Sequence, residues 1–161
     1  MAKEHEKPEQ PAKAFEIQRI YLVDASFESP QAPAIFTKEI KPNHNVEINA
    51  NNKKIADNIY EVVVVITLTV KAEEDIAYLI EIKHGGIFTI VGYEDQEVAQ
   101  ILGAQCPGII YPFAREAICD LAVKGGFPQV HLAPINFDSL YAHHVREQAQ
   151  ANIEKDDAIK H

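Results

Sequence analysis

Apolar and polar residues follow a period of two along four stretches in the first half of the chain. The stretches cover residues 15–28, 46–51, 59–70 and 76–83. Alternate residues of a strand point to opposite faces of a sheet, so this pattern predicts four strands. Residues 59–70 (IYEVVVVITLTV) are apolar in both alternating sets. We therefore expect this third strand to present apolar side chains on both of its faces.

The second half of the chain changes to a helical period. A short helix is expected from residue 98 to about residue 103, followed by a helix over 112–124 that begins at Pro112 and ends at two glycines. Asn136 is expected to cap a last helix. Four strands precede these helices without βαβ crossovers, which predicts an α+β protein with an antiparallel sheet.

Polar segments rich in proline or charge divide the chain. Residues 1–14 are expected to form a disordered tail, residues 15–150 a single domain, and residues 151–161 a polar tail that frays. Three prolines interrupt residues 30–42, and this spacing predicts a long ordered loop with apolar side chains. Long loops of this kind are often functional.

Composition limits the classes of function. The chain has 161 residues and a formal net charge of -9, and an acidic surface repels nucleic-acid phosphates. The charged N-terminus lacks the apolar centre of a signal peptide, and no apolar run reaches the roughly 20 residues that span a bilayer. Two cysteines, Cys106 and Cys119, make no disulfide framework. These features predict a cytoplasmic protein without nucleic-acid partners or membrane insertion.

Apolar segments are abundant, but catalytic motifs are not evident in the sequence. His143 and Glu147 have an i, i+4 spacing that could bind zinc, yet a third ligand is not evident. Cys106 has no evident histidine partner, and the glycine pairs do not form a phosphate-binding motif. Excess apolar surface without such groups predicts a binding protein without metal, cofactor or catalysis.

Several segments, taken in order, closely resemble the SecB family of protein-export chaperones. They are IQRIY (17–21), DASFESP (24–30), IYEVV (59–63), EIKHGGIF (81–88), LGAQCP (102–107), PFARE (112–116), GFPQ (126–129) and LAPINFD (132–138). The resemblance covers roughly residues 15–148. It implies a four-stranded antiparallel sheet with helices on one face, assembled into a homotetramer as a dimer of dimers.

The resemblance also implies a function. Family members bind non-native precursor proteins in long apolar grooves without using a nucleotide, and deliver them to SecA, the motor of the Sec translocon. The SecA contacts of the family fall on Asp24, Glu28, Leu79 and Glu81 of this chain. If the first and fourth strands are neighbours, their alternation would bring these four side chains together as an acidic patch. The zinc-bearing C-terminal tail of SecA is the expected partner.

The family resemblance further points to a client groove and to an assembly surface. The expected groove residues are Phe36, Ile40, Val46, Ile48, Tyr111, Phe127, Phe137, Leu140 and Tyr141. Family members often carry tryptophan at the place of Ile40, and this chain has none. Phe113 is a further groove candidate, and Phe113 and Phe137, which are expected on helices, are the candidates expected to lie in the core instead. Ala117 and Leu121 are expected at the contact between dimers.

Two alternatives remain open from the sequence. One is a SecB-like chaperone linked to stress or to a toxin–antitoxin pair, which would not engage SecA. The other is a small-ligand binding protein or enzyme whose pocket uses Tyr111 and Tyr141. Binding of SecA separates the first alternative from an export chaperone, and a monomer with a closed cavity would favour the second.

Overall fold

The four strands form one antiparallel sheet in the order β1–β4–β3–β2. The computed structural model describes residues 9, 11–39 and 41–159. β1 spans Ala14–Glu28, β2 spans Pro42–Ala56, β3 spans Ile59–Ala72 and β4 spans Asp75–Val91. The predicted α+β class and four-stranded antiparallel sheet are confirmed.

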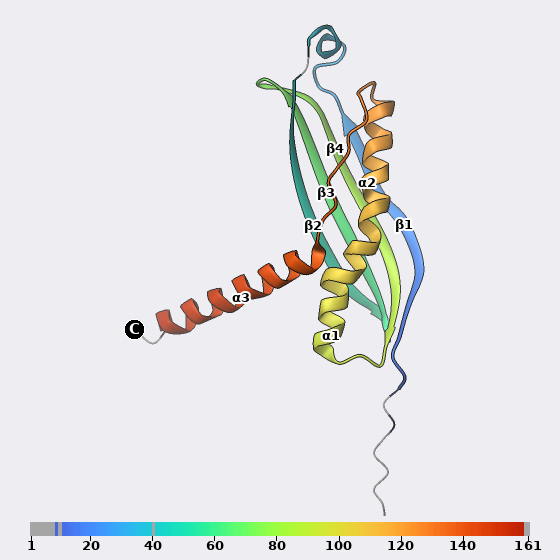
Figure 1. Ribbon diagram of the computed structural model, residues 1–161, viewed down its shortest axis with the longest axis vertical. Helices are drawn as coiled ribbons and strands as arrows, with labels where there is room; N and C mark the ends of the chain where they lie inside the picture. Colours follow the sequence, from blue (N-terminus) through green and yellow to red (C-terminus); the bar gives the residue numbers. More distant parts are fainter. Residues whose placement is uncertain (1–8, 10, 40, 160–161) are drawn as a thin grey trace, which may run out of the picture.

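One continuous helical stretch packs on one face of this sheet (Figure 1). A short 3-10 helix, η1 (Ala34–Thr37), lies between β1 and β2. α1 (Asp95–Gln100), the π-helical η2 (Ile101–Gln105) and α2 (Cys106–Lys124) follow one another without a break. α3 (Phe137–Ile159) projects away from the sheet (Figure 1).

The core lies between α2 and the inner faces of β3 and β4. Its fully buried members include alternate residues of β3, among them Val62, Val64, Ile66 and Leu68, and Ile118 of α2. The other alternating set of β3 is only half-buried and points to the sheet face without helices. The prediction that β3 is apolar on both faces is therefore correct, but the described chain covers only one face with helices.

β4 is much longer than the sequence predicted, because it continues through Gly85 and Gly86. A Cβ atom on Gly85 would lie 2.8 Å from a ring carbon of Tyr21 on the neighbouring strand. The Tyr21 side chain crosses over this glycine, and its hydroxyl donates a hydrogen bond to Glu61 of β3. The glycine pair therefore allows close packing in the middle of a strand, and the predicted end of this strand at residue 83 was wrong.

The helix expected to begin at Pro112 instead begins at Cys106 and contains Pro112 in its interior. The N–H group of Cys106 donates to the carbonyl of Ile101, a π-type bond that precedes Pro107. Pro112 lacks the N–H group that would bond Gly108, and both residues are exposed. Water can therefore reach the unpaired carbonyl, which makes an internal proline tolerable here.

The last helix begins as predicted. The Asn136 side-chain oxygen accepts a hydrogen bond from the Ser139 N–H group at 3.1 Å. α3 then continues to Ile159, past the expected domain boundary at residue 150. Of the expected N-terminal tail, residues 1–8 and 10 lie outside the described residues.

His84 of β4 is buried beneath α2, with 9% of its surface exposed. Its ring lies 5.9 Å from that of Phe113, and its Nδ1 atom has no hydrogen-bond partner among the described residues. Burial lowers the pKa of His84, and the Gly85 backbone and the Glu116 charge oppose this shift. The neutral imidazole is thus the form that the core favours.

Gly103 and Gly108 lie in the same helical stretch but differ in what an added methyl group would meet. A Cβ atom would lie 2.4 Å from Tyr141 Cδ2 at Gly103, and 3.9 Å from Phe137 Cδ2 at Gly108. We expect Gly103→Ala to lower the free energy of unfolding by about 1–3 kcal/mol through overpacking. Gly108→Ala, the matched control, should raise it by up to about 1 kcal/mol. Urea titrations measure both, and a stabilising Gly103→Ala would contradict the Tyr141 contact.

His84 should make the fold less stable in acid. Because its folded-state pKa lies below the ordinary value of 6.5, the unfolded chain binds the proton first as the pH falls. The free energy of unfolding should decrease from about pH 6.5 down to the folded-state pKa, and His84→Leu should remove this loss. Urea unfolding at about pH 7.5 and about pH 5.5 measures it.

The control for this experiment is His143→Gln, since His143 is exposed on α3. It should lose as much stability in acid as the unmodified chain. An equal loss in His84→Leu would show that another group causes the acid sensitivity.

Candidate functional site

The free face of the sheet brings the four predicted acidic-patch residues together. β1 pairs with β4, so that Asp24 lies opposite Lys83 and Glu28 opposite Leu79. Glu81 lies between Leu79 and Lys83 on the same face of β4. Asp24 and Glu28 are exposed, whereas Leu79 and Glu81 are half-buried. We call Asp24, Glu28, Leu79 and Glu81 the acidic patch.

Three further residues border the acidic patch, and the sequence analysis missed them. The Glu81 carboxylate lies 3.8 Å from the Lys83 ammonium group and accepts a hydrogen bond of 3.4 Å from the Thr67 hydroxyl. Glu47 of β2 lies opposite Thr67 in the register and adds a carboxylate to this face. Strand pairing would have revealed all three, because Thr67 lies in register with Glu81, Glu47 with Thr67, and Lys83 two residues after Glu81.

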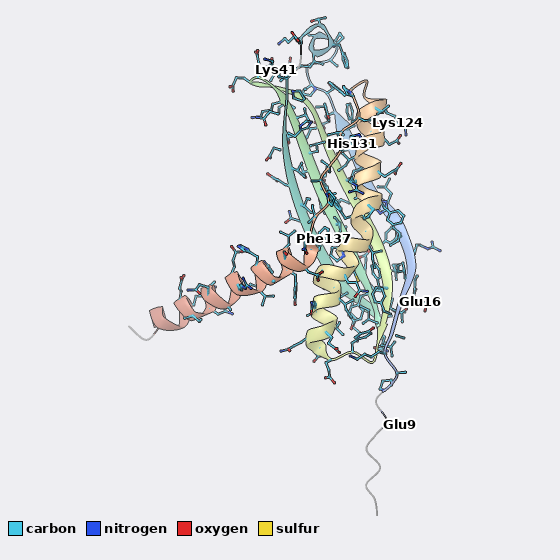
Figure 2. The ribbon with its side chains drawn as sticks, viewed as in Figure 1. Glu9, Glu16, Lys41, Lys124, His131 and Phe137 are labelled. Atoms are coloured by element: carbon cyan, nitrogen blue, oxygen red, sulfur yellow. The ribbon has the colours of Figure 1, made fainter. Side chains whose placement is uncertain are left out.

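An apolar hollow of about 430 Å³ opens between β2 and the segment that follows α2. We call it the loop hollow. It is lined by Pro42, His44, Val46, Val70, Ala77, Tyr78, Phe127, Pro128, Gln129, Val130, His131, Leu132 and Ala133. The segment carrying residues 127–133 runs in extended form over the sheet between α2 and α3, where Figure 2 labels His131.

Aromatic rings pack together at one end of the loop hollow. The Phe127 ring lies 4.5 Å from that of Tyr78 and 5.1 Å from that of Phe36, measured between centroids. Phe27 of β1 lies 5.9 Å from Tyr78 and packs against Gly125, where a Cβ atom would be 2.1 Å from its ring. These rings fix the point at which the chain leaves α2 and crosses the sheet.

A second hollow of about 630 Å³ opens beside the first turns of α3. We call it the helix hollow. Its lining comes from β2, α1, η2 and α3, namely Ile48, Asn49, Ala50, Asn52, Asp95, Val98, Ala99, Leu102, Gly103, Phe137, Leu140, Tyr141 and His144. Leu140 is 52% exposed there, so the helix hollow has apolar surface available to a ligand.

Most of the predicted groove residues border one of these two hollows. Val46 and Phe127 line the loop hollow, and Phe36, 50% exposed, packs on Phe127. Residues Ile48, Phe137, Leu140 and Tyr141 line the helix hollow. Ile40 lies outside the described residues. His44, Tyr78 and His131 also line the loop hollow but were not predicted from the sequence, although His44 alternates with Val46 along β2.

The prediction that Tyr111 lies in the client groove is wrong, because this residue lines neither hollow. It is 4% exposed, and its hydroxyl donates a hydrogen bond of 2.7 Å to the carbonyl of Ala133. Burial raises the pKa of Tyr111 against the opposing charge of Arg115, so the hydroxyl stays protonated and remains a donor. Tyr111 therefore fastens the extended segment to α2 and supports the hollows from inside the core.

α2 carries a partly exposed apolar stripe beside its buried face. Ala117 and Leu121, the predicted assembly residues, are half-buried within the single chain. Phe113, one turn before Ala117, is 48% exposed, so its expected place in the core is wrong. Leu22 of β1 lies opposite His84 and is 53% exposed. Apolar side chains thus remain uncovered along α2 and β1.

The other sequence candidates for chemistry do not form a site within the described residues. His143 lies 3.6 Å from Glu147, but no group of three or more potential metal ligands occurs there. Burial raises the pKa of Cys106 to about 12, so its thiol is not a nucleophile near neutral pH. In the same part of the chain, the helices are too short or too polar to span a bilayer.

Proteins with similar sequences include several named protein-export protein SecB. The model of the family "Preprotein translocase subunit SecB" matches residues 8–148. A protein-export protein SecB from Hahella chejuensis is 49% identical over 161 residues, which is 100% of both chains. Another from Marinobacter nauticus is 47% identical over 136 residues, covering 84% of this chain and 82% of its own.

The fold also resembles a solved structure, the SecB-like chaperone of Mycobacterium tuberculosis in complex with an antitoxin peptide. The TM-score is 0.62 at 15% sequence identity, over 75% of this chain and 90% of that one. At this identity the similarity concerns the fold alone. The match of the family model over most of the chain and the high identity to named relatives show that this chain belongs to the SecB family.

Proposed function

We propose that this chain is an ATP-independent chaperone of the cytoplasm that holds non-native precursor proteins and delivers them to SecA. The observation that carries this proposal is a pair of open hollows along β2, one beside the segment that follows α2 and one beside the first turns of α3. Val46 and Leu140 expose apolar surface at these hollows. This apolar surface is available to an apolar segment of a non-native protein.

Client binding follows from burial of apolar surface. An unfolded segment that enters the hollows loses contact with water, which contributes roughly 25 cal/mol per Å² of apolar area before ordering costs. Few polar groups line the loop hollow, so few hydrogen bonds select a particular client sequence. Binding lowers the concentration of free aggregation-prone chains by mass action and needs no nucleotide.

The acidic patch is the proposed docking site for SecA. Its carboxylates surround the half-buried Leu79, an arrangement suited to a basic segment with an apolar contact. It lies on the free sheet face, whereas the hollows lie on the helix side. Client binding and SecA docking can therefore occur at the same time, as delivery requires.

Assembly is proposed to cover the remaining apolar surface. Phe113, Ala117 and Leu121 form a stripe along α2, and Leu22 adds apolar area from β1. Copies of this chain that pack through α2 would bury the stripe and form the dimer of dimers. The alternative of a SecB-like chaperone that does not engage SecA predicts the same hollows but no binding at the acidic patch.

A charge reversal in the acidic patch should separate SecA docking from client binding. Without ATP, the purified chain should suppress light scattering by an aggregating unfolded protein, and Glu81→Lys should do so equally well. The same variant should lose binding to the SecA tail by at least about tenfold, since it replaces attraction with repulsion. Isothermal calorimetry with the zinc-loaded tail measures this loss.

Glu16→Lys is the matched control, because Glu16 lies on the same sheet face near the other end of β1 (Figure 2). It should bind the tail as tightly as the unmodified chain. Failure to suppress aggregation would overturn the chaperone proposal. Suppression without any SecA binding would favour the alternative.

Leu121→Glu should halve the assembly. A carboxylate at a buried helix contact costs several kcal/mol and has no partner there. Light scattering should give a mass of about four chains for the unmodified protein and about two for the variant. Val123→Glu is the control, because Val123 is exposed and lies about 200° around the helix from Leu121. A monomeric unmodified protein would contradict the proposed assembly.

A further inference from the structure

The loop hollow has a lining without fixed charge. None of its thirteen lining residues is an aspartate, glutamate, lysine or arginine, although these types make up 24% of the chain. The ionisable side chains in the lining are His44, His131 and Tyr78. Burial raises the pKa of Tyr78, so this phenol stays neutral at physiological pH. The charge of the hollow therefore depends on two imidazoles.

The two histidines come from opposite walls of the hollow. His44 belongs to β2 and lies opposite Val70, on the face that carries the helices. His131 belongs to the extended segment between α2 and α3 (Figure 2). Both side chains are exposed, so they stand at the mouth, where the flanks of a bound segment would emerge.

The charged side chains near the loop hollow do not belong to its lining. On β3, Lys71 alternates with Val70 and points to the free face. Asp75 of β4 is ion-paired with Lys38 at 3.0 Å, and Lys41 precedes β2. None of the four lines the hollow.

On the side of α2, His131 also borders a small cleft that contains Arg115 and Glu116. These two charges are of opposite sign and lie outside the lining of the loop hollow. The helix hollow differs from the loop hollow, because Asp95 gives it a fixed negative charge beside His144. Of the two hollows, the loop hollow is therefore the one whose lining can become charged only through histidine.

We propose that His44 and His131 determine which charged flanks a client segment may carry when its apolar part occupies the loop hollow. Histidine changes its charge between about pH 5 and pH 8. With neutral imidazoles, the hollow accepts apolar segments flanked by residues of either sign. With protonated imidazoles, it favours acidic flanks and disfavours basic ones. This inference deepens the proposed chaperone function and depends on it.

Two labelled peptides with the same apolar centre test this inference. One carries glutamates on both flanks and the other carries lysines, and fluorescence anisotropy gives the Kd of each for the full assembled chain. From about pH 8 to about pH 5.5, the ratio of the lysine-peptide Kd to the glutamate-peptide Kd should rise about fivefold or more. Fivefold corresponds to one unit-charge contact at about 4 Å in water.

The variant His44→Gln/His131→Gln should abolish this rise. His143→Gln, which removes an exposed imidazole of α3 outside both hollows, is the control and should keep the rise. An equal rise in both variants, or none in the unmodified chain, would overturn the inference and leave the chaperone function intact. Absence of binding by both peptides at every pH would instead overturn the proposed client site.

Discussion

The architecture depends on one helix that covers a sheet wider than itself. Four strands at a spacing of about 4.8 Å span roughly 14 Å between their outer axes, and side chains add to this width. A helix with its side chains is only about 10–12 Å across. α2 packs on β4 and β3, so the inner faces of β1 and β2 lie at its two sides. Leu22 on β1 and Val46 on β2 remain 53% and 38% exposed for this reason.

The two sides of α2 differ in how the chain covers the sheet beside them. On the β2 side, the segment after α2 crosses the sheet in extended form, and Tyr111 and Phe127 fasten it to the core. An extended segment is too thin to fill the space that a second helix would fill, so the loop hollow and the helix hollow remain. On the β1 side nothing in the described chain covers Leu22 and Phe113, which leaves an apolar surface suited to another copy.

The free sheet face is organised by side-chain contacts across strands. Tyr21 of β1 reaches over Gly85 to donate a hydrogen bond to Glu61 of β3, and Lys53 of β2 lies 3.0 Å from the same carboxylate. These contacts span all four strands. Burial, followed by the hydrogen bond and charge of Glu61, raises the pKa of Tyr21 to about 12, so the hydroxyl remains a donor. The face is thereby held in a fixed register, which keeps Glu81 and Leu79 beside β1.

The sequence by itself determined the four strands, the helix cap at Asn136 and the face on which Asp24 and Glu28 lie, because alternation and capping are local properties. Only the tertiary structure decided the places of Gly85 and Pro112. Both residue types usually interrupt regular structure. Here the Tyr21 side chain packs over Gly85 in β4, and solvent reaches the carbonyl that Pro112 leaves unpaired in α2. The same holds for Tyr111, Phe113, His44 and His131. Whether an aromatic ring supports a hollow from the core or an imidazole stands at its mouth depends on contacts between distant segments, which no local pattern records.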